Sequence, residues 1–389
     1  MSLDIYRNIA SWKKPLHTAR TQIAKWWARA NPQVDIIGIT GSVGKTTTKE
    51  AIFSVLSQKF SSVASHANLD PVFNIPITLL KIRPWTRKVI LELGVEYPGE
   101  MDFYLSLVRP KIGVITRIYW THTEFLGDLQ GVINEKGKLL GVLPEDGWAV
   151  LNDNDQYIRE MARKAKAKIF WFGTHPHCQI QITDFLHQGR DGSEFVLKNG
   201  EESVKIKWKL LGEHNTVSAA AAASVGILAG LRLKDIKKGL ERLEPQPHRL
   251  NLVSGPKRSW ILDDSYNSSP EAAMMALETL RSLAHKSESF AVLGDMLELG
   301  NYSEQGHREV GQKVAQENID YLFTIGNQAK IIADEAKKSG AKNVVCVKDQ
   351  KEIAKKLKEL IGKDDLILIK GSRVTNLDKL VLDLTSRAD

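Results

Sequence analysis

The sequence predicts an α/β protein of two domains, each built on a mostly parallel sheet, with a short amphipathic helix ahead of them. Three observations predict this class. Short apolar runs alternate with helical patterns, the first of these runs leads directly into a glycine-rich loop, and two prolines, Pro245 and Pro247, interrupt the alternation further along. A chain of 389 residues has room for two or three domains, each with its own core.

The composition excludes several classes of protein. No apolar run approaches the roughly 18 to 20 residues of a membrane-spanning helix, and the first residues lack the apolar segment and cleavage site of a secretory signal. Cys178 and Cys346 lie far apart without metal-ligand spacing, which argues against a disulfide framework and a zinc site and favours the cytoplasm. The formal charge of +8 fits acidic partners such as nucleotides, anionic lipid or nucleic acid.

Residues 1–33 are predicted to form the amphipathic helix. Apolar side chains recur there at helical spacing, and six basic residues, Arg7 among them, accompany a single acid, Asp4. Pro15 is expected to kink this helix or to start a second one. A basic helix with tryptophans can lie on an anionic membrane, so peripheral membrane contact is one prediction. Packing on its own domain or on a partner protein is the equal alternative.

The first domain is predicted over residues 34–247. Between Gln179 and Leu210 the apolar period shortens to two, which indicates a small antiparallel insert. The alanine-rich stretch over 215–230 is typical of a buried helix that packs closely on a sheet. The runs expected to form the parallel strands, with helices covering both faces, are VDII, KVILELG, KIGVITRI, GWAVLND and KIFWFG.

The second domain is predicted over residues 248–389. Alternation of apolar runs and helical patterns restarts there, which predicts a Rossmann-like α/β domain. Its expected strands are WILDDSY, SFAVLGDM, DYLFTIG, NVVCV and DLILIKGS.

The glycine-rich loop over residues 41–47 predicts a phosphate site. The loop follows a strand and opens a helix, so backbone N–H groups and the positive helix end can converge on phosphate oxygens. Lys45 would neutralise the β- and γ-phosphates, and the Thr46 hydroxyl would hold Mg²⁺. The glycine spacing misses the strict P-loop pattern by one place, but this context predicts a P-loop NTPase-like first domain. The residues of the predicted site are Gly41, Ser42, Val43, Gly44, Lys45, Thr46 and Thr47.

A phosphate loop does not name a reaction, because motors, switches, kinases and ligases all use one. Eight blocks of sequence are more specific: ITGSVGKTTTKEAI, SHANLDPVFNIPITLL, LELGVEYPGEMD, VITRIYWTHTEFLGDLQGVINEKGKLL, LLGEHNTVSAAAAA, ILDDSYNSSPEAAMMAL, AVLGDMLELGNYSEQGHREVG and LIKGSRVTNLDKL. Through these blocks the chain resembles the Mur ligase family, and within it the MurF type, in family order from about Ile36 to Leu384.

The resemblance implies an ATP-dependent ligase that activates a carboxylate as an acyl phosphate, which an amine then attacks to form an amide. This chemistry gathers negative charge in one place, so cations must be concentrated there, and the family uses two Mg²⁺ ions. Thr46 and Glu92 match ligands of the first ion, and His122 matches a ligand of the second. Lys136 falls where the family carries a carbamylated lysine, whose new carboxylate helps to bind the second ion.

The resemblance also implies the contacts with ATP. His214 and Asn215 would hold the base and ribose, Asp264 the ribose, and Arg249 the γ-phosphate. Because Arg249 and Asp264 follow the predicted domain boundary, the site is expected to be complete only when the second domain closes over the first.

The block that contains Lys370, Ser372 and Arg373 lies, in the family, near the incoming amine substrate and its carboxylate, which an arginine suits. The residues to which the resemblance assigns catalytic roles are Lys45, His122, Lys136 and Arg249.

The chain departs from the family in three places. MurF-type ligases begin with a domain that grips the UDP end of their substrate, and that domain is expected to be missing, because only about 33 residues precede the first predicted strand. Glu96 and Arg117 stand where the family has asparagines beside the metal and acyl substrate. Ser218 stands at a changed position of the helix near the base. These departures leave the acyl acceptor open.

The predicted function is MurF-like addition of D-alanyl-D-alanine to a muropeptide precursor in peptidoglycan synthesis, by a cytoplasmic monomer that can work at the inner face of the membrane. An alternative is a related ligase that builds another peptide or poly-amino acid, on a pseudomurein-like or lipid-linked acceptor. A nucleotide-dependent nucleic-acid-binding protein would fit the charge, but no binding motif supports it, so no nucleic-acid partner is expected. A membrane scaffold with a vestigial site is disfavoured because the ATP and metal residues are all retained.

Overall fold

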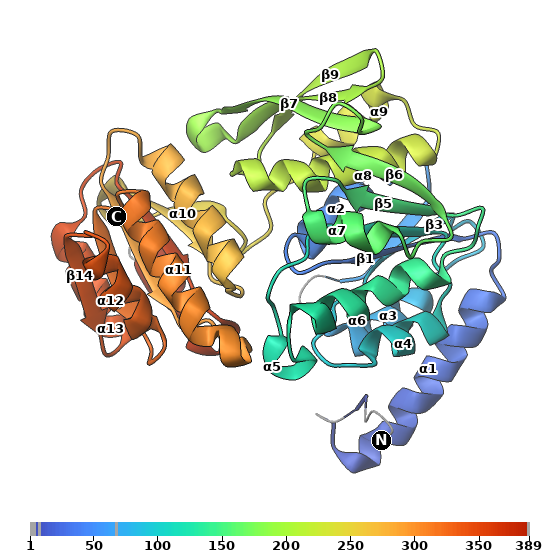
Figure 1. Ribbon diagram of the computed structural model, residues 1–389, viewed down its shortest axis with the longest axis horizontal. Helices are drawn as coiled ribbons and strands as arrows, with labels where there is room; N and C mark the ends of the chain where they lie inside the picture. The colour runs from blue at the N-terminus through green and yellow to red at the C-terminus, as the bar shows by residue number, and fades with distance from the viewer. Residues whose placement is uncertain (1–4, 7–8, 67–68, 387–389) are drawn as a thin grey trace.

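The computed structural model describes residues 5–6, 9–66 and 69–386. Two α/β domains lie side by side (Figure 1). The first is coloured from blue to yellow and the second from yellow-orange to red. The first contains a sheet of nine strands and the second a sheet of six. Both sheets are largely parallel, which confirms the predicted fold class.

In the first sheet the strand order is β2-β3-β1-β4-β5-β6-β7-β8-β9. Pairing is parallel from β2 to β7 and antiparallel between β7, β8 and β9. β1 lies between β3 and β4, so chain order reverses on either side of it. The strands are β1 (Asp35–Thr40), β2 (Ser62–Ala64), β3 (Lys88–Glu92), β4 (Ile112–Ile115), β5 (Trp148–Asn152), β6 (Lys168–Gly173), β7 (Ile180–His187), β8 (Ser193–Asn199) and β9 (Glu202–Trp208).

Helices cover both faces of this sheet because the buried strands are apolar on both sides. Ile37 and Ile39 of β1 point into the core shared with α2, α8 and α9, and Ile36 points into the core on the other face. Residues 219–223 of α8 are all alanines with no exposed surface, which confirms the predicted buried helix. The helices are α2 (Lys45–Leu56), α3 (Pro71–Leu79), α4 (Glu100–Leu107), α5 (Thr123–Leu126), α6 (Leu129–Val142), α7 (Gln156–Ala162), α8 (Thr216–Leu228) and α9 (Leu233–Glu241).

Two features of this sheet were not predicted from the sequence: the strand β2, and the way in which the antiparallel segment joins the sheet. β2 has only three half-buried residues, too few to show an apolar period. The predicted antiparallel segment is confirmed as β7 to β9, and it extends the main sheet, because β7 pairs in parallel with β6 through Phe172–Ile180 and Gly173–Gln181. Phe195 and Ile206, on β8 and β9, are fully buried in the same core as β1.

The second sheet has the order β10-β11-β15-β12-β13-β14, and only β10 runs antiparallel to its neighbour. The sequence did not predict β10, a short, partly exposed strand directly after the proline-rich linker. Separate cores lie on the two faces. The elements are β10 (Asn251–Ser254), β11 (Trp260–Asp264), α10 (Pro270–Ala284), β12 (Ser289–Gly294), α11 (Ser303–Gln316), β13 (Tyr321–Ile325), α12 (Ala329–Lys338), β14 (Asn343–Val347), α13 (Gln350–Leu360), β15 (Leu366–Lys370) and α14 (Leu377–Thr385).

The N-terminal helix α1 (Lys14–Arg29) is shorter than predicted. Pro15 lies in its first turn, where the missing N–H costs no hydrogen bond, so it starts the helix and does not kink it. α1 buries Thr21 and Ala24 and contacts α3 and α4. Residues 1–4 and 7–8, including Asp4 and Arg7 of the predicted helix, lie outside the described residues. Over the described part of the chain, every helix is too short or too polar to cross a bilayer.

Candidate active site

A cavity of about 450 Å³ lies between the two domains. Its walls in the first domain follow the carboxyl ends of β1, β3 and β4, and its walls in the second domain include residues that follow β11 and β12. Open α/β sheets bind ligands at this edge, at the strand where chain order reverses, and here that strand is β1. The volume lies within the usual range for small-molecule sites.

The loop between β1 and α2 needs glycine at two positions. Gly41 has a φ of 147°, and a Cβ there would lie 2.0 Å from the Thr116 hydroxyl. Gly44, the N-cap of α2, has a φ of 82°. The Ser42 side chain donates to the Tyr119 carbonyl and accepts from the Tyr119 N–H, so the loop is fastened to the segment that follows β4. All residues from 42 to 47 line the cavity.

Lys45 and Thr46 begin α2 inside this loop. The Lys45 ammonium donates to the Gly41 carbonyl at 2.9 Å and to the Ser42 carbonyl at 3.3 Å, which holds the cation over the loop. Burial lowers its pKa, and the charge of Glu92 opposes that shift. The Thr46 hydroxyl donates to Glu92 Oε1 at 3.0 Å, so two predicted ligands of the first Mg²⁺ are brought together.

His122, the predicted ligand of a second Mg²⁺, contacts the second domain. Its Nδ1 lies 2.6 Å from Glu298 Oε2. Burial lowers the pKa of His122, and the hydrogen bond from His122 lowers the pKa of Glu298. A neutral imidazole that donates through Nδ1 to a carboxylate leaves Nε2 as a basic, oriented lone pair for a metal. The φ angles of His122 and Glu298 are positive, 58° and 65° respectively. Such strained backbone conformations cluster at functional sites.

Lys136, on α6, is fully buried, and its Nζ has no hydrogen-bond partner among the described residues. Burial lowers its pKa well below the ordinary value, and the positive charge of Lys45 adds to the shift. A buried ammonium without a partner is strongly unfavourable, so this environment favours the neutral amine. This orphaned amine fits carbamylation, since a neutral amine can attack CO₂ and the resulting carboxylate would be an anionic oxygen ligand for Mg²⁺.

The predicted nucleotide residues of the first domain lie at the start of α8. His214 and Asn215 line the cavity, and the Asn215 amide donates to the Leu211 carbonyl at 2.7 Å. Burial lowers the pKa of His214 to about 3, so its ring is neutral and can contact a base. Ser218 accepts from the Thr48 hydroxyl at 2.9 Å, which ties α8 to the phosphate-loop helix.

Two of the predicted residues of the second domain form an ion pair. Lys370 Nζ lies 2.5 Å from Asp264 Oδ2 and also donates to the Asn267 carbonyl. Burial raises the pKa of Asp264, while Lys370 lowers it. The predictions assigned these residues to different substrates, ribose and amine, but the geometry makes them one unit at the end of β11 and β15.

Arg249 and Arg373 flank one aromatic ring. Their guanidinium carbons lie 4.2 Å and 5.1 Å from the centre of the Tyr266 ring. Arg249 and Tyr266 line the cavity, whereas Arg373 is exposed outside it. Ser372 is buried, and its hydroxyl accepts from the Leu297 N–H, so it positions the segment that carries Glu298 and has no surface in the cavity.

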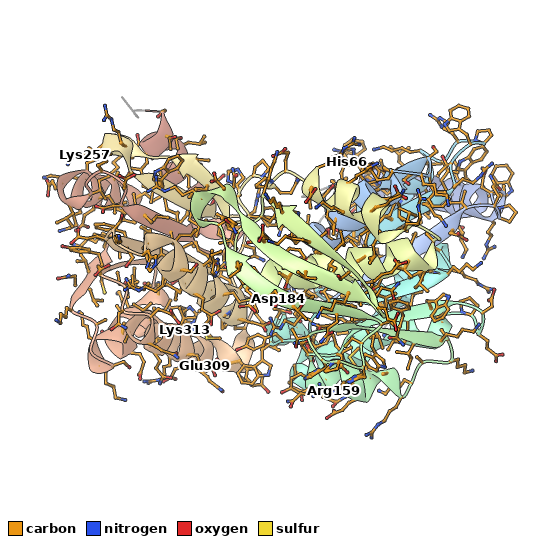
Figure 2. The ribbon with its side chains drawn as sticks, turned by 90° about the horizontal axis from the view of Figure 1, so that it is seen from above. His66, Arg159, Asp184, Lys257, Glu309 and Lys313 are labelled. Carbon is orange, nitrogen blue, oxygen red and sulfur yellow. The ribbon has the colours of Figure 1, made fainter. Side chains whose placement is uncertain are left out.

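Glu96 and Arg117, which stand where the family has asparagines, both put an ionisable group into the wall of the cavity. Burial, reinforced by the charges of Glu298 and Glu100, raises the pKa of Glu96 to about 7. Arg117 Nε lies 2.8 Å from Oε1 of Glu271, on α10 of the second domain. Tyr119, two residues further on, donates to Glu309 of α11 at 3.1 Å; Glu309 is labelled in Figure 2. Arg117 therefore belongs to the contact between the domains as well as to the cavity.

Glu271 makes the stability of this contact depend on pH. Burial raises its pKa from the ordinary 4.5 to about 7, although Arg117 opposes the shift. A carboxyl group that binds its proton more tightly in the folded state makes the free energy of unfolding fall as pH rises from 4.5 to about 7. Glutamine cannot lose a proton, so the Glu271→Gln variant should lack this loss of stability at high pH. The change that the substitution makes in the free energy of unfolding is therefore expected to be more favourable at pH 8 than at pH 5, by about 1–3 kcal/mol.

Urea unfolding at the two pH values measures this difference. Asp334→Asn, at an exposed carboxylate on α12, is the control and should leave the pH dependence unchanged. If the free energy of unfolding of the Glu271→Gln variant depends on pH as that of the unsubstituted protein does, Glu271 is not the cause of the pH dependence.

Sequence reasoning did not assign Glu298, Tyr266 and Glu271 a place in the site, although each lies inside a block quoted for the family. Their partners, His122, Arg249 and Arg117, come from a different part of the chain in every case. No local pattern marks such a partner, because the contacts of Glu298 and Glu271 join the two domains, and Tyr266 meets Arg249 only in the folded second domain.

Comparison with known proteins agrees with this geometry. The family model of the Mur ligase middle domain matches residues 39–226, and that of the Mur ligase glutamate ligase domain matches residues 248–373. The chain is 34% identical over 368 residues to the UDP-N-acetylmuramoyl-tripeptide–D-alanyl-D-alanine ligase of Bacillus subtilis, which covers 94% of this chain and 79% of that relative.

Two solved structures share the fold. MurF from Acinetobacter baumannii superposes with a TM-score of 0.87 at 28% identity, over 95% of this chain and 81% of that one. MurF from Thermotoga maritima, in complex with ADP, superposes with a TM-score of 0.84 over 95% and 83% of the two chains, and at 24% identity it speaks for the fold alone.

Proposed function

Because the chain belongs to the Mur ligase family, we propose that it is an ATP-dependent, ADP-forming ligase that adds D-alanyl-D-alanine to a muropeptide precursor in peptidoglycan synthesis. The relatives that carry this activity in their names match nearly the whole chain. The observation that carries the proposal is the gathering of Lys45, the Thr46–Glu92 pair and His122 around one cavity that the second domain completes.

ATP would bind with its phosphates along residues 41–47. Lys45 is already held over the loop by two carbonyl groups, so its charge is positioned before any phosphate arrives. His214 and Asn215 would receive the base and ribose, and Arg249 would approach the phosphates from the second domain. Transfer of the γ-phosphoryl group to the carboxylate of the acyl substrate concentrates negative charge at this point, where fixed cations stabilise it most.

Thr46, Glu92, His122 and Lys136 would hold two Mg²⁺ ions, Lys136 as its carbamate. When bound, these ions would neutralise phosphate and carboxylate charge. The pair of Thr46 and Glu92, the Nε2 atom of His122 and the Lys136 amine, which has no hydrogen-bond partner in the described part of the chain, all fit that role. Glu298 would keep the imidazole oriented.

The amine substrate would enter from the side of the second domain. Arg249, held against Tyr266, lines the cavity on this side, where it would bind the γ-phosphate beside the incoming amine. Lys370 is neutralised by Asp264, so its contribution would be to position that carboxylate for the ribose more than to bind the amine substrate. Arg373, which is exposed outside the cavity, would contact the carboxylate of the amine substrate only at the cavity entrance.

The direct test supplies ATP and UDP-muramoyl tripeptide to the purified chain, with and without D-alanyl-D-alanine. We expect ADP release that depends on the dipeptide, together with a product whose mass shows one new amide bond. If an amide forms only with a lipid-linked or pseudomurein-like acceptor, the proposed acyl substrate is wrong but the ligase reaction stands. ATP consumption that depends on nucleic acid and yields no amide would overturn the proposal.

We also propose that α1 holds the enzyme against the inner face of the membrane. Leu16, Ile23 and Trp26 of α1 are each more than half exposed, and their spacings of seven and three residues put them on one side of the helix. Trp12, in the 3-10 turn directly before α1, is also more than half exposed. Lys and Arg side chains lie between them, and tryptophan with basic residues suits the interface of an anionic bilayer. The opposite side of α1, with Ala24, packs on the first domain.

Replacing both Trp12 and Trp26 by serine is therefore expected to reduce co-sedimentation with anionic phosphatidylglycerol vesicles at least about tenfold, because two interfacial anchors are lost. ATP-dependent ligation in solution should not change. Leu382→Ser is the matched control, an apolar side chain 61% exposed on α14 of the other domain. Equal sedimentation of the double variant and the unsubstituted chain would favour a partner protein or no partner for this face.

A further inference from the structure

A second group of metal-ligating side chains lies on the first domain, away from the cavity between the domains. Asp153 directly follows β5, and His177 and Cys178 lie in the turn that joins β6 to β7. β5 and β6 are parallel neighbours, so the segments that leave their carboxyl ends lie together. One donor atom from each of these three side chains lies within 4.8 Å of the other two.

The group is held in place by its backbone. The Asp153 N–H donates to the Phe172 carbonyl at 2.9 Å, and the Asp153 carbonyl accepts from the guanidinium of Arg159, on α7 (Figure 2). The Cys178 N–H donates to the His175 carbonyl at 3.1 Å, which closes the turn. Asp153 and Cys178 are buried, whereas His177 is 62% exposed and leaves a way in from solvent.

The two histidines already converge on one carboxylate oxygen. His175 Nδ1 lies 2.6 Å and His177 Nε2 3.1 Å from Asp153 Oδ2, and the two rings are parallel. A thiolate, an imidazole and a carboxylate are together the ligands of zinc and its neighbours, not of Mg²⁺ or Ca²⁺. Zinc bond lengths of about 2.0–2.3 Å in a tetrahedron separate ligand atoms by roughly 3.3–3.8 Å, so small side-chain rotations would complete the site.

We propose that Asp153, His177 and Cys178 bind one divalent transition metal of the zinc class. His175 would donate its Nδ1–H to the ligating carboxylate, the usual partner of a metal-bound group. Solvent would occupy the fourth position beside the exposed His177. The wide separation of the two cysteines argues only against a site that uses both thiols. Here one cysteine, Cys178, is joined by its neighbour His177 and by Asp153, which the sheet brings from 25 residues away.

The metal would brace two loops that lie at the same edge of the sheet as the cavity. Asn154 and Thr174, beside the ligands, already join these loops through a side-chain hydrogen bond of 2.7 Å. Asp155 accepts from the Ile118 N–H at 2.7 Å, next to the Tyr119 segment that holds the phosphate loop. A structural role is expected, since none of the three ligands lines the cavity.

The test is titration of the metal-free full chain with Co²⁺, without nucleotide or Mg²⁺. We expect one equivalent to produce the absorption of a tetrahedral Co²⁺–thiolate complex, and one equivalent of Zn²⁺ to remove it and raise the melting temperature. His177→Ala changes an exposed side chain and should fold, and it should weaken Co²⁺ binding at least about tenfold. Cys178→Ser should abolish the thiolate absorption.

Cys346→Ser is the matched control, because Cys346 is an exposed free thiol on β14 of the second domain. It should bind Co²⁺ like the unsubstituted chain. No thiolate absorption in the unsubstituted chain, or absorption that survives in a folded Cys178→Ser variant, would overturn the proposal. So would Co²⁺ binding that is unchanged in the His177→Ala variant.

Discussion

Replacing Lys136 by alanine is expected to lower the rate of ATP-dependent ligation by at least about 100-fold, since a ligand of the second Mg²⁺ would be lost. The substitution should not reduce the melting temperature as much as an ordinary buried deletion does. Its amine has no hydrogen-bond partner among the described residues, so no buried bond is broken. Steady-state ADP release and thermal unfolding of the same preparations would measure both effects.

Lys138→Ala is the matched control, two residues along α6. Lys138 pairs with the exposed Asp102 and with the buried Glu135. Glu135 also accepts from the N–H groups of Gly99 and Met101, so the loss of Lys138 should leave the rate within a few-fold of the unsubstituted enzyme. If carbamylation is the reason for the effect, a short carboxylate such as acetate should restore part of the activity of Lys136→Ala and none to Lys45→Met. Full activity of Lys136→Ala would contradict the metal role.

Replacing Lys45 by methionine is expected to lower kcat/KM for ATP by about 100- to 1,000-fold. Methionine keeps much of the side-chain volume but removes the charge that the carbonyl groups of Gly41 and Ser42 hold over the loop. The control is Lys59→Met, an exposed lysine just after the other end of α2, which should change kcat/KM little. A Lys45→Met variant that keeps its kcat/KM for ATP would contradict the proposed phosphate site.

The glycine-rich loop of the first domain could be predicted from the sequence because its pattern is local. The residues that make a phosphate loop are consecutive, and the glycines at 41 and 44 are required by positive φ values within that same stretch. The apolar runs predicted most strands for the same reason, since burial on both faces imposes a continuous apolar run. β2 and β10 were missed because three or four half-exposed residues carry no such pattern.

Long-range contacts could not be read in this way. His122 and Glu298 lie 176 residues apart and Arg117 and Glu271 154 apart, and neither pair has a sequence pattern of its own. The same holds for Asp153 with Cys178, which only the adjacency of β5 and β6 brings together.

By itself the sequence determined the fold class, the glycine-rich loop after the first strand and the family, because each depends on the type and order of neighbouring residues. Only the tertiary structure decided that the buried amine of Lys136 has no hydrogen-bond partner among the described residues, that Lys370 pairs with Asp264, and that Trp12 and Trp26 are exposed. Burial and pairing depend on which surfaces meet when the sheets and domains pack. They set the charge state and the accessibility of each side chain, and so its chemistry.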